Sequence, residues 1–327
     1  ANGSLVSGLA VSPTVVALGK PRLNPNGLPG IQDTVRVFEL QGATWAEVAV
    51  LSSAEALPSS ASFGSALALE GDLLAVGDPS AAATGVASGL VHLYRRGPSG
   101  WALEQVLSAS DGLAGLFGKS LDLEDGRVVV GAPSSSIVTI EEGAVYVYEE
   151  LAGAFVEVQR VDNPTPLEFG QFGADVDLQA SRLAIGSPGG ALDGTAYVYE
   201  DAGSGSFSFL AQLLPSEPVS GGGFGRSVAM DGARVAVGSP FACQSVSTCL
   251  GRVTVFDSLP GGWTEVAVLE GSAPNGTDGF GSDLEFEGGS LFVASDGSAS
   301  GARFDPTVSG WVQTESYITS AGFTWVA

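Results

Sequence analysis

Five carboxylates lie on the predicted first strands of the repeated units, and they are the residues of this chain that could do chemistry together. They are Asp122, Asp175, Asp177, Asp283 and Glu285. Carboxylates that converge bind cations, and a pair in which one group stays protonated can act as acid and base. Cation binding, glycosidase-like catalysis and a hydrated polar lining without a ligand therefore all stay open for these residues.

The single histidine, His92, does not complete a catalytic set. Corresponding places elsewhere in the sequence hold Tyr146, Tyr197 and Thr254, which indicates a packing position. No Gly-x-Ser-x-Gly segment is present, and the glycine-rich run at 220–223 lacks the Lys-Ser/Thr pair of a phosphate loop. We therefore identify no catalytic residue and expect the chain not to be an enzyme.

The two cysteines, Cys243 and Cys249, lie six positions apart. A metal site at this place would lack further Cys or His ligands, whereas a local disulfide needs only this pair. The spacing therefore predicts a disulfide, with free thiols as the alternative. A disulfide would indicate an oxidising compartment.

The elements that carry these residues repeat along the chain. Phe-Gly pairs recur at intervals of 54, 55, 52 and 56 residues: Phe63-Gly64, Phe117-Gly118, Phe172-Gly173, Phe224-Gly225 and Phe280-Gly281. A period of this length is typical of units that bury their faces only against one another.

Each repeat is expected to hold four strands. In the third repeat, alternation of apolar and polar residues predicts strands at 117–123 and 143–148, and β-branched residues predict one at 127–133. A fourth begins at the aromatic residue Phe155. A tight turn at 124–126 joins the first two strands.

Short strands with two apolar faces, repeated without change of period, favour an all-β fold: a β-propeller of six four-stranded blades. Seven blades with one incomplete is the alternative, and two stacked sandwich domains would not explain the uniform period. We expect one domain over 1–327, with repeats near 5–62, 63–116, 117–171, 172–223, 224–279 and 280–318, and a closing or donated strand at 319–327. First strands line the channel of such a ring, where the five carboxylates would meet.

The motifs Phe-Gly-x-Ser-Leu/Val, Gly-x-Pro and Gly-x-Val-Tyr-Val-Tyr resemble FG-GAP repeats over residues 5 to 315. Such repeats occur in the head of integrin α subunits and in secreted bacterial proteins, and the short bacterial form is the more similar. Calcium-binding blades of that family carry an Asp-x-Asp-x-Asp-Gly loop after the first strand. Here that connection is as short as Glu124-Asp125-Gly126, too short to surround calcium. We therefore carry over no calcium site and expect no cofactor.

The connections that leave one face of the predicted blades are long and varied. They include the segments 21–30, 79–89, 133–143, 162–171 and 240–251. Variable loops on a rigid scaffold are common places for binding. An extracellular protein or a glycan is the partner that we expect at this face.

The charge balance excludes several partners. With 36 acidic and 13 basic residues, the formal net charge of −23 repels nucleic acid and anionic membranes. No stretch approaches the ~20 apolar residues of a membrane span. A start at Ala1 without Met suits a processed product, so we expect a secreted or cell-surface protein, bacterial in origin.

Together these features predict a non-enzymatic extracellular recognition or adhesion module. A self-assembling subunit of a surface layer or filament, pairing through Ser320 to Ala327, is an alternative. An enzyme that acts on polysaccharide is a further alternative, supported only by the five carboxylates.

Overall fold

The protein is described by a computed structural model that covers residues 8–20, 33–53, 62–81, 88–113, 115–136, 138–190, 193–243, 248–271, 277–296 and 300–318. Every regular element in these ranges is a β-strand. The chain divides into two compact units, Ala1–Asp162 (unit 1) and Asn163–Ala327 (unit 2), and each is described by itself. No helix in the described ranges could cross a membrane.

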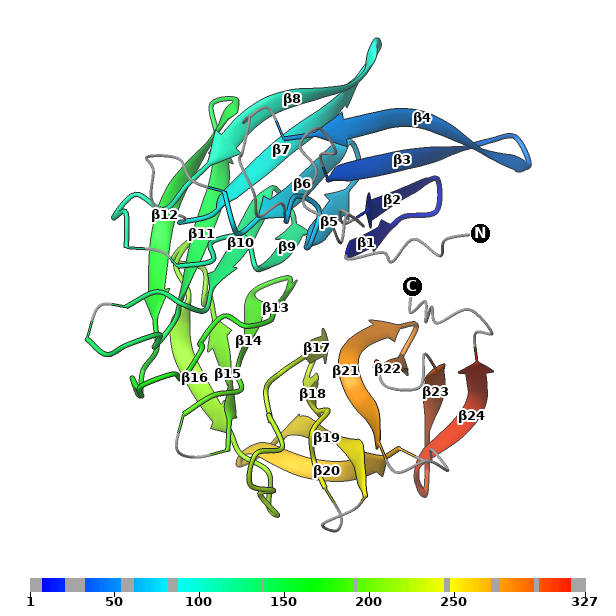
Figure 1. Cartoon of the computed structure of the whole chain (residues 1–327). Helices are drawn as coiled ribbons and strands as arrows, with labels where there is room; N and C mark the ends of the chain where they lie inside the picture. Colours follow the sequence, from blue (N-terminus) through cyan, green and yellow to red (C-terminus); the bar gives the residue numbers. More distant parts are fainter. Residues whose placement is uncertain are drawn as a thin grey trace, which may run out of the picture. The chain divides into compact units, whose positions relative to one another are not determined.

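Unit 1 holds three four-stranded antiparallel sheets, blades 1 to 3, whose strands follow the sequence order (Figure 1). Blade 1 comprises β1 (Gly8–Val11), β2 (Val15–Lys20), β3 (Thr34–Gln41) and β4 (Thr44–Ser52). Blade 2 comprises β5 (Leu67–Glu70), β6 (Leu73–Asp78), β7 (Leu90–Gly97) and β8 (Gly100–Leu107). Blade 3 comprises β9 (Ser120–Glu124), β10 (Arg127–Ala132), β11 (Ala144–Leu151) and β12 (Ala154–Asp162).

Unit 2 holds blades 4 to 6. Blade 4 comprises β13 (Val176–Gln179), β14 (Arg182–Ser187), β15 (Thr195–Glu200) and β16 (Ser208–Leu213). Blade 5 comprises β17 (Val228–Asp231), β18 (Arg234–Ser239), β19 (Cys249–Leu259) and β20 (Gly262–Glu270). Blade 6 comprises β21 (Thr277–Glu287), β22 (Ser290–Ser295), β23 (Ser300–Thr307) and β24 (Gly310–Ile318). A short parallel pairing of β19 with β21 joins blades 5 and 6.

The inner strands of each blade are covered on both faces. In β10 every residue after Arg127 is buried, whereas the outer strand β8 is mostly exposed. Strands buried on both faces read as continuous β-branched or apolar runs. This is why the second strands are the clearest strands in the sequence.

The phenylalanine of each Phe-Gly pair is a core residue. Phe117 and Phe172 are fully buried, and their rings meet Tyr146 and Tyr197 edge to face, with both ring centroid distances 5.4 Å. Phe117 also belongs to an apolar cluster that includes Val91 of blade 2. The phenylalanines therefore fasten a blade to its neighbour within a unit.

The Phe-Gly pair does not begin the first strand, and the predicted start at Phe117 is wrong. Strand β9 begins at Ser120, and Phe117 instead makes a parallel bridge to Gly89 of blade 2. A Cβ added to Gly77 would lie 2.2 Å from the carbonyl oxygen of Gly118. The glycines are required because the backbones of adjacent blades touch here.

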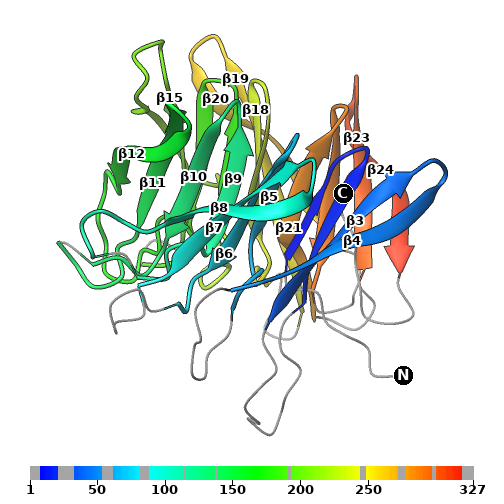
Figure 2. The same cartoon turned by 90° about the horizontal axis from the view of Figure 1, so that it is seen from above.

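Antiparallel order places the connections of each unit at two ends of its blades. Links from a second to a third strand, and from a fourth strand to the next blade, leave from the same end, which we call the loop end (Figure 2). The two kinds of loop bond to each other, as in Ser134 N–H to the Gly115 carbonyl at 3.1 Å. The predicted closing or donated strand, Ser320 to Ala327, lies outside the described residues.

Candidate functional site

Two of the five predicted carboxylates link neighbouring blades of unit 2. The Asp175 Oδ2 atom accepts the N–H of Val228 at 2.8 Å, and the Asp177 Oδ2 atom accepts the N–H of Met230 at 2.6 Å. Val228 and Met230 lie on β17. The edge of β17 that does not pair with β18 carries N–H groups that need partners. Asp175 and Asp177 therefore have a structural task, which is to bind the edge of the next blade.

Two of the other three carboxylates accept a backbone N–H from their own strand. Asp122 of unit 1 and Asp283 of unit 2 each accept the N–H of the following residue, Leu123 at 2.7 Å and Leu284 at 3.0 Å. Desolvation and the charge of Asp296 raise the pKa of Asp283, although its side chain keeps contact with solvent. Glu285 is exposed on β21.

Among the described residues no group of three or more His, Cys, Asp or Glu side chains is arranged to hold a metal ion. The predicted cation site therefore stays a prediction.

At the loop end, a tyrosine anchors the segment that enters blade 3. The Tyr146 hydroxyl donates to Asp111 Oδ2 at 3.0 Å, and Arg160 Nη1 donates to the same oxygen at 2.7 Å. The Arg160 guanidinium also lies over the Tyr146 ring. In blade 4 the Tyr197 hydroxyl lies 2.6 Å from Thr165 Oγ1. Each of these tyrosines thus ties a blade to the loop that precedes it.

His92 takes the tyrosine position in blade 2. It is fully buried, its ring meets Phe63 at 5.3 Å, and neither ring nitrogen has a hydrogen-bond partner among the described residues. Burial lowers its pKa to about 4, so the ring is neutral at physiological pH. His92 has the packing role that its place in the repeat indicates.

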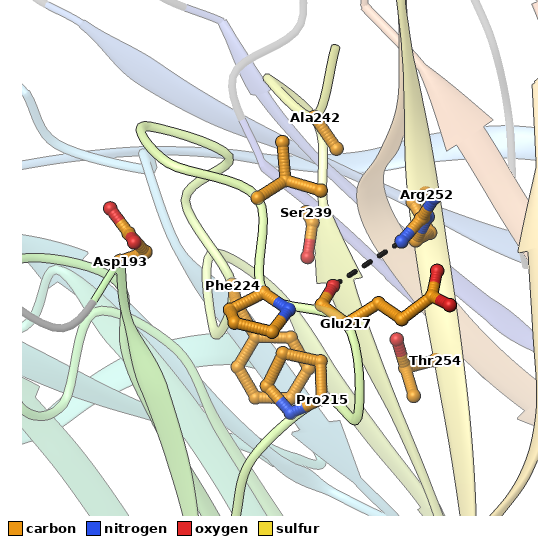
Figure 3. Close-up of a pocket in the computed structure, with 10 residues that line it drawn as sticks. Asp193, Pro215, Glu217, Phe224, Ser239, Ala242, Arg252 and Thr254 are labelled. Carbon is orange, nitrogen blue, oxygen red and sulfur yellow. Dashed lines mark hydrogen bonds between the residues drawn. The ribbon is translucent and has the colours of Figure 1, made fainter. Parts of the chain in front are cut away.

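Thr254 takes the same position in blade 5, and a recess lies beside it (Figure 3). The recess is lined by Asp193, Pro215, Glu217, Pro218, Val219, Phe224, Ser239, Ala242, Arg252 and Thr254. Its volume is about 10 Å³, enough for about one water molecule. Thr254 is fully buried, and its Oγ1 atom has no hydrogen-bond partner in the described part of the chain.

Arg252 supplies the positive charge of the recess. Its Nη1 atom donates to the Glu217 carbonyl oxygen at 3.4 Å, the dashed line in Figure 3, and its Nη2 atom donates to Glu270 Oε1 at 3.0 Å. The Nε atom is buried and finds no partner among the described residues. A buried N–H of this kind is costly unless a ligand or water accepts it. Arg252 and Thr254 both line the recess, and each has one buried polar atom without a hydrogen-bond partner among the described residues, Nε and Oγ1 respectively.

An exposed aromatic residue directly precedes a lining residue of the recess in the sequence. Phe241 is 58% exposed, its N–H donates to the Gly222 carbonyl at 3.1 Å, and its neighbour Ala242 lines the recess. Cys243 and Cys249 form a disulfide that closes the loop between them, as predicted. The lining residues Ala242 and Arg252 lie close to these two cysteines in the sequence.

The recess was not identified from the sequence. The sequence nevertheless holds a sign of it, because aligning the third strands places Thr254 at the position that Tyr146 and Tyr197 hold in other repeats. Asp193 lies on a connection between strands, and connections differ in length from blade to blade, so no periodic pattern marks it.

Three comparisons relate the fold to known proteins. The family model described as "FG-GAP repeat" matches residues 101–148, which run from β8 to β11. No curated protein matches the chain. The structure is similar to that of a periplasmic gluconolactonase from Pseudomonas aeruginosa, with a TM-score of 0.58 and 19% identity over 89% of this chain and 80% of that one. At this identity the likeness shows the fold.

The prediction of a non-enzymatic recognition or adhesion module is wrong. The prediction rested on the propeller fold and on the lack of a catalytic motif. However, most of the chain has the same fold as a protein named as a gluconolactonase. Propellers carry unrelated functions on one scaffold, and the site decides between them. The predicted fold class is confirmed: the fold is a β-propeller, and residues 101–148 match the FG-GAP repeat.

Proposed function

We propose that this chain is an exported β-propeller protein that binds a small, neutral, hydroxyl-rich molecule of the sugar class at the loop end of blade 5. The observation that carries the proposal is the recess itself. It is lined by Arg252 and Thr254, whose Nε and Oγ1 atoms have no hydrogen-bond partner among the described residues, and the exposed residue Phe241 directly precedes the lining residue Ala242.

The charges around the recess favour a neutral ligand. Asp193 and Glu217 line it and Glu270 pairs with Arg252, so carboxylates outnumber the single guanidinium. A ligand anion would be repelled by this excess and by the net charge of −23. Hydroxyl groups suit the site, because they can donate to carboxylates and also accept from Arg252.

Phe241 adds an apolar surface. The C–H face of a sugar ring can pack against an exposed aromatic ring such as Phe241, while its hydroxyls meet the polar groups beside it. Ligand sites commonly combine apolar area with a few placed polar groups in this way.

Export is supported by two observations. The disulfide between Cys243 and Cys249 favours an oxidising compartment. The similar solved structure is named as periplasmic.

Binding is tested by isothermal titration calorimetry on the whole chain with a panel of neutral monosaccharides, sugar lactones and sugar acids. We expect neutral members to bind and the acids to bind more weakly. Phe241→Ala should weaken binding about tenfold, on the scale of a lost aromatic contact. The matched control is Phe209→Ala, which changes a phenylalanine 51% exposed on β16 and should leave affinity unchanged. Equal loss in both variants, or no binding by the wild type, would contradict the proposal.

Hydrolysis of a sugar lactone is a second candidate function, favoured by the likeness to a protein named as a gluconolactonase. Water would add to the ester carbonyl carbon, the ring C–O bond would break, and the ring oxygen would leave as a hydroxyl after taking a proton. Glu217 could accept the proton of the water, and Arg252 could stabilise the oxyanion.

The lactonase candidate is tested by pH-stat titration of gluconolactone against its spontaneous hydrolysis. Glu217→Gln should lower the rate at saturating lactone to the background, with the affinity of the variant measured in parallel by calorimetry. A rate that never exceeds the background would exclude the activity and leave the binding proposal standing.

A further inference from the structure

Tyr146, Tyr197 and Thr254 share one structural position, which His92 holds in blade 2. Tyr146 pairs with Val130, Tyr197 with Ile185, and Thr254 with Val237, each at the same place in its blade. The comparison between blades therefore shows what a tyrosine does at this position and what changes when a threonine replaces it.

In blades 3 and 4 the tyrosine fills the space under the entry loop. Each ring packs on the phenylalanine of its own Phe-Gly pair at 5.4 Å, and each hydroxyl reaches the entry loop, at Asp111 or Thr165. These blades use the position for internal packing.

In blade 5 the shorter Thr254 makes neither of these contacts. Phe224 keeps one aromatic neighbour, Phe256 at 6.2 Å. The recess borders Phe224, Thr254 and the entry-loop segment 215–219, which is where a tyrosine ring and hydroxyl would lie.

We propose that Thr254 is a specificity-determining residue, and that it selects ligands with one protruding hydroxyl that enters the deep end of the recess. This inference rests on the proposed function and names the feature of the ligand that the site reads. The volume of about 10 Å³ is about that of one water molecule, which matches a single hydroxyl of a ligand.

The unpaired groups of Arg252 and Thr254 suit a ligand hydroxyl. Its oxygen accepts the N–H of Arg252 Nε, and its proton is donated to Thr254 Oγ1, so both unused groups are satisfied at once. A ligand without that hydroxyl would leave both groups unpaired, which costs binding free energy. A site of this kind therefore discriminates against ligands that lack the hydroxyl.

The test uses two variants, each assayed by calorimetry against the neutral sugars, the lactones and their deoxy analogues. Thr254→Val keeps the shape and removes the hydroxyl, so we expect affinity to fall about tenfold for sugars and not for the analogue that lacks the protruding hydroxyl. Thr254→Tyr should abolish binding with an unchanged or higher melting temperature, because tyrosine fits this position in blades 3 and 4. Thr264→Val, at an exposed place on β20, is the control.

The possible failures can be told apart. If the wild type binds sugars and Thr254→Val binds them equally well, the inference is overturned and the proposed function stands. Sugar binding by Thr254→Tyr at wild-type affinity would also overturn it. If the wild type binds no member of the panel, both fail. Should Thr254→Tyr not fold, Thr254→Val and the deoxy analogues still decide the matter.

Discussion

The buried histidine of blade 2 gives a pH-dependent stability that can be calculated and measured. His92 is fully buried without a hydrogen-bond partner among the described residues, and burial lowers its pKa from 6.5 to about 4. Between pH 6.5 and pH 4, His92 is protonated in the unfolded chain and neutral in the folded chain. Stability is therefore unaffected by His92 near pH 8, falls as the pH drops through 6.5, and stops falling near pH 4.

The size of the effect follows from the distance between the folded and unfolded pKa values of His92. Full protonation of the unfolded chain alone corresponds to roughly 3 kcal/mol, because a tenfold change in proton affinity is worth about 1.4 kcal/mol. About 2 kcal/mol of this should already be lost between pH 7 and pH 5. His92→Phe removes the titration and keeps an aromatic ring beside Phe63, so its stability should lack this component.

The assay is urea unfolding of the wild type and His92→Phe at pH 7, 6 and 5. Carboxylates titrate in both proteins, so the difference between the two free energies of unfolding isolates the histidine. We expect this difference to grow by about 2 kcal/mol towards pH 5 in favour of the variant. A difference that stays constant within the error of the fits would refute a buried, neutral His92.

Three further predictions concern the junctions between blades. Gly77→Ala, whose Cβ would lie 2.2 Å from a backbone oxygen, should cost at least ~2 kcal/mol of unfolding free energy, whereas Gly97→Ala, with its nearest atom at 4.0 Å, should cost far less. Phe117→Ala should cost ~3–5 kcal/mol, and a loss near zero would show that the ring is not a blade anchor. Asp177→Ala should destabilise by ~1–3 kcal/mol because the Met230 N–H loses its acceptor, and Asp177→Asn, which keeps an oxygen, should recover most of that; equal losses would argue against this bond.

Much of the fold could be predicted because each unit repeats one local pattern. Strand β10 reads as Val128-Val129-Val130 and is buried on both faces, so its sequence and structure agree directly. The pair Phe117-Gly118 was harder, because alternation continues through it, whereas Gly118 has a positive φ and Phe117 bridges to the preceding blade, so strand β9 begins only at Ser120. Backbone contacts between repeats leave no mark in the alternation of apolar and polar residues.

The site could be predicted only in part. The sequence places Asp175 and Asp177 at a channel and leaves cation binding, catalysis and a hydrated lining open. Which N–H groups they accept depends on the offset between blades, which periodicity does not contain. The Cys243 pairing was predictable because the loop is short. The recess required a comparison among blades, since Thr254 is informative only beside Tyr146 and Tyr197.

The central claim is that the recess of blade 5 binds a neutral sugar-class molecule. Its most direct test is a titration of the ¹⁵N-labelled whole chain with neutral sugars and sugar lactones, followed by NMR. The account predicts saturable shifts in the signals of Arg252 Nε–H and of the backbone amides of Thr254 and Ala242, with little change in the matching residues of blade 4. No saturable shift at millimolar ligand, or shifts confined to residues away from the recess, would contradict it.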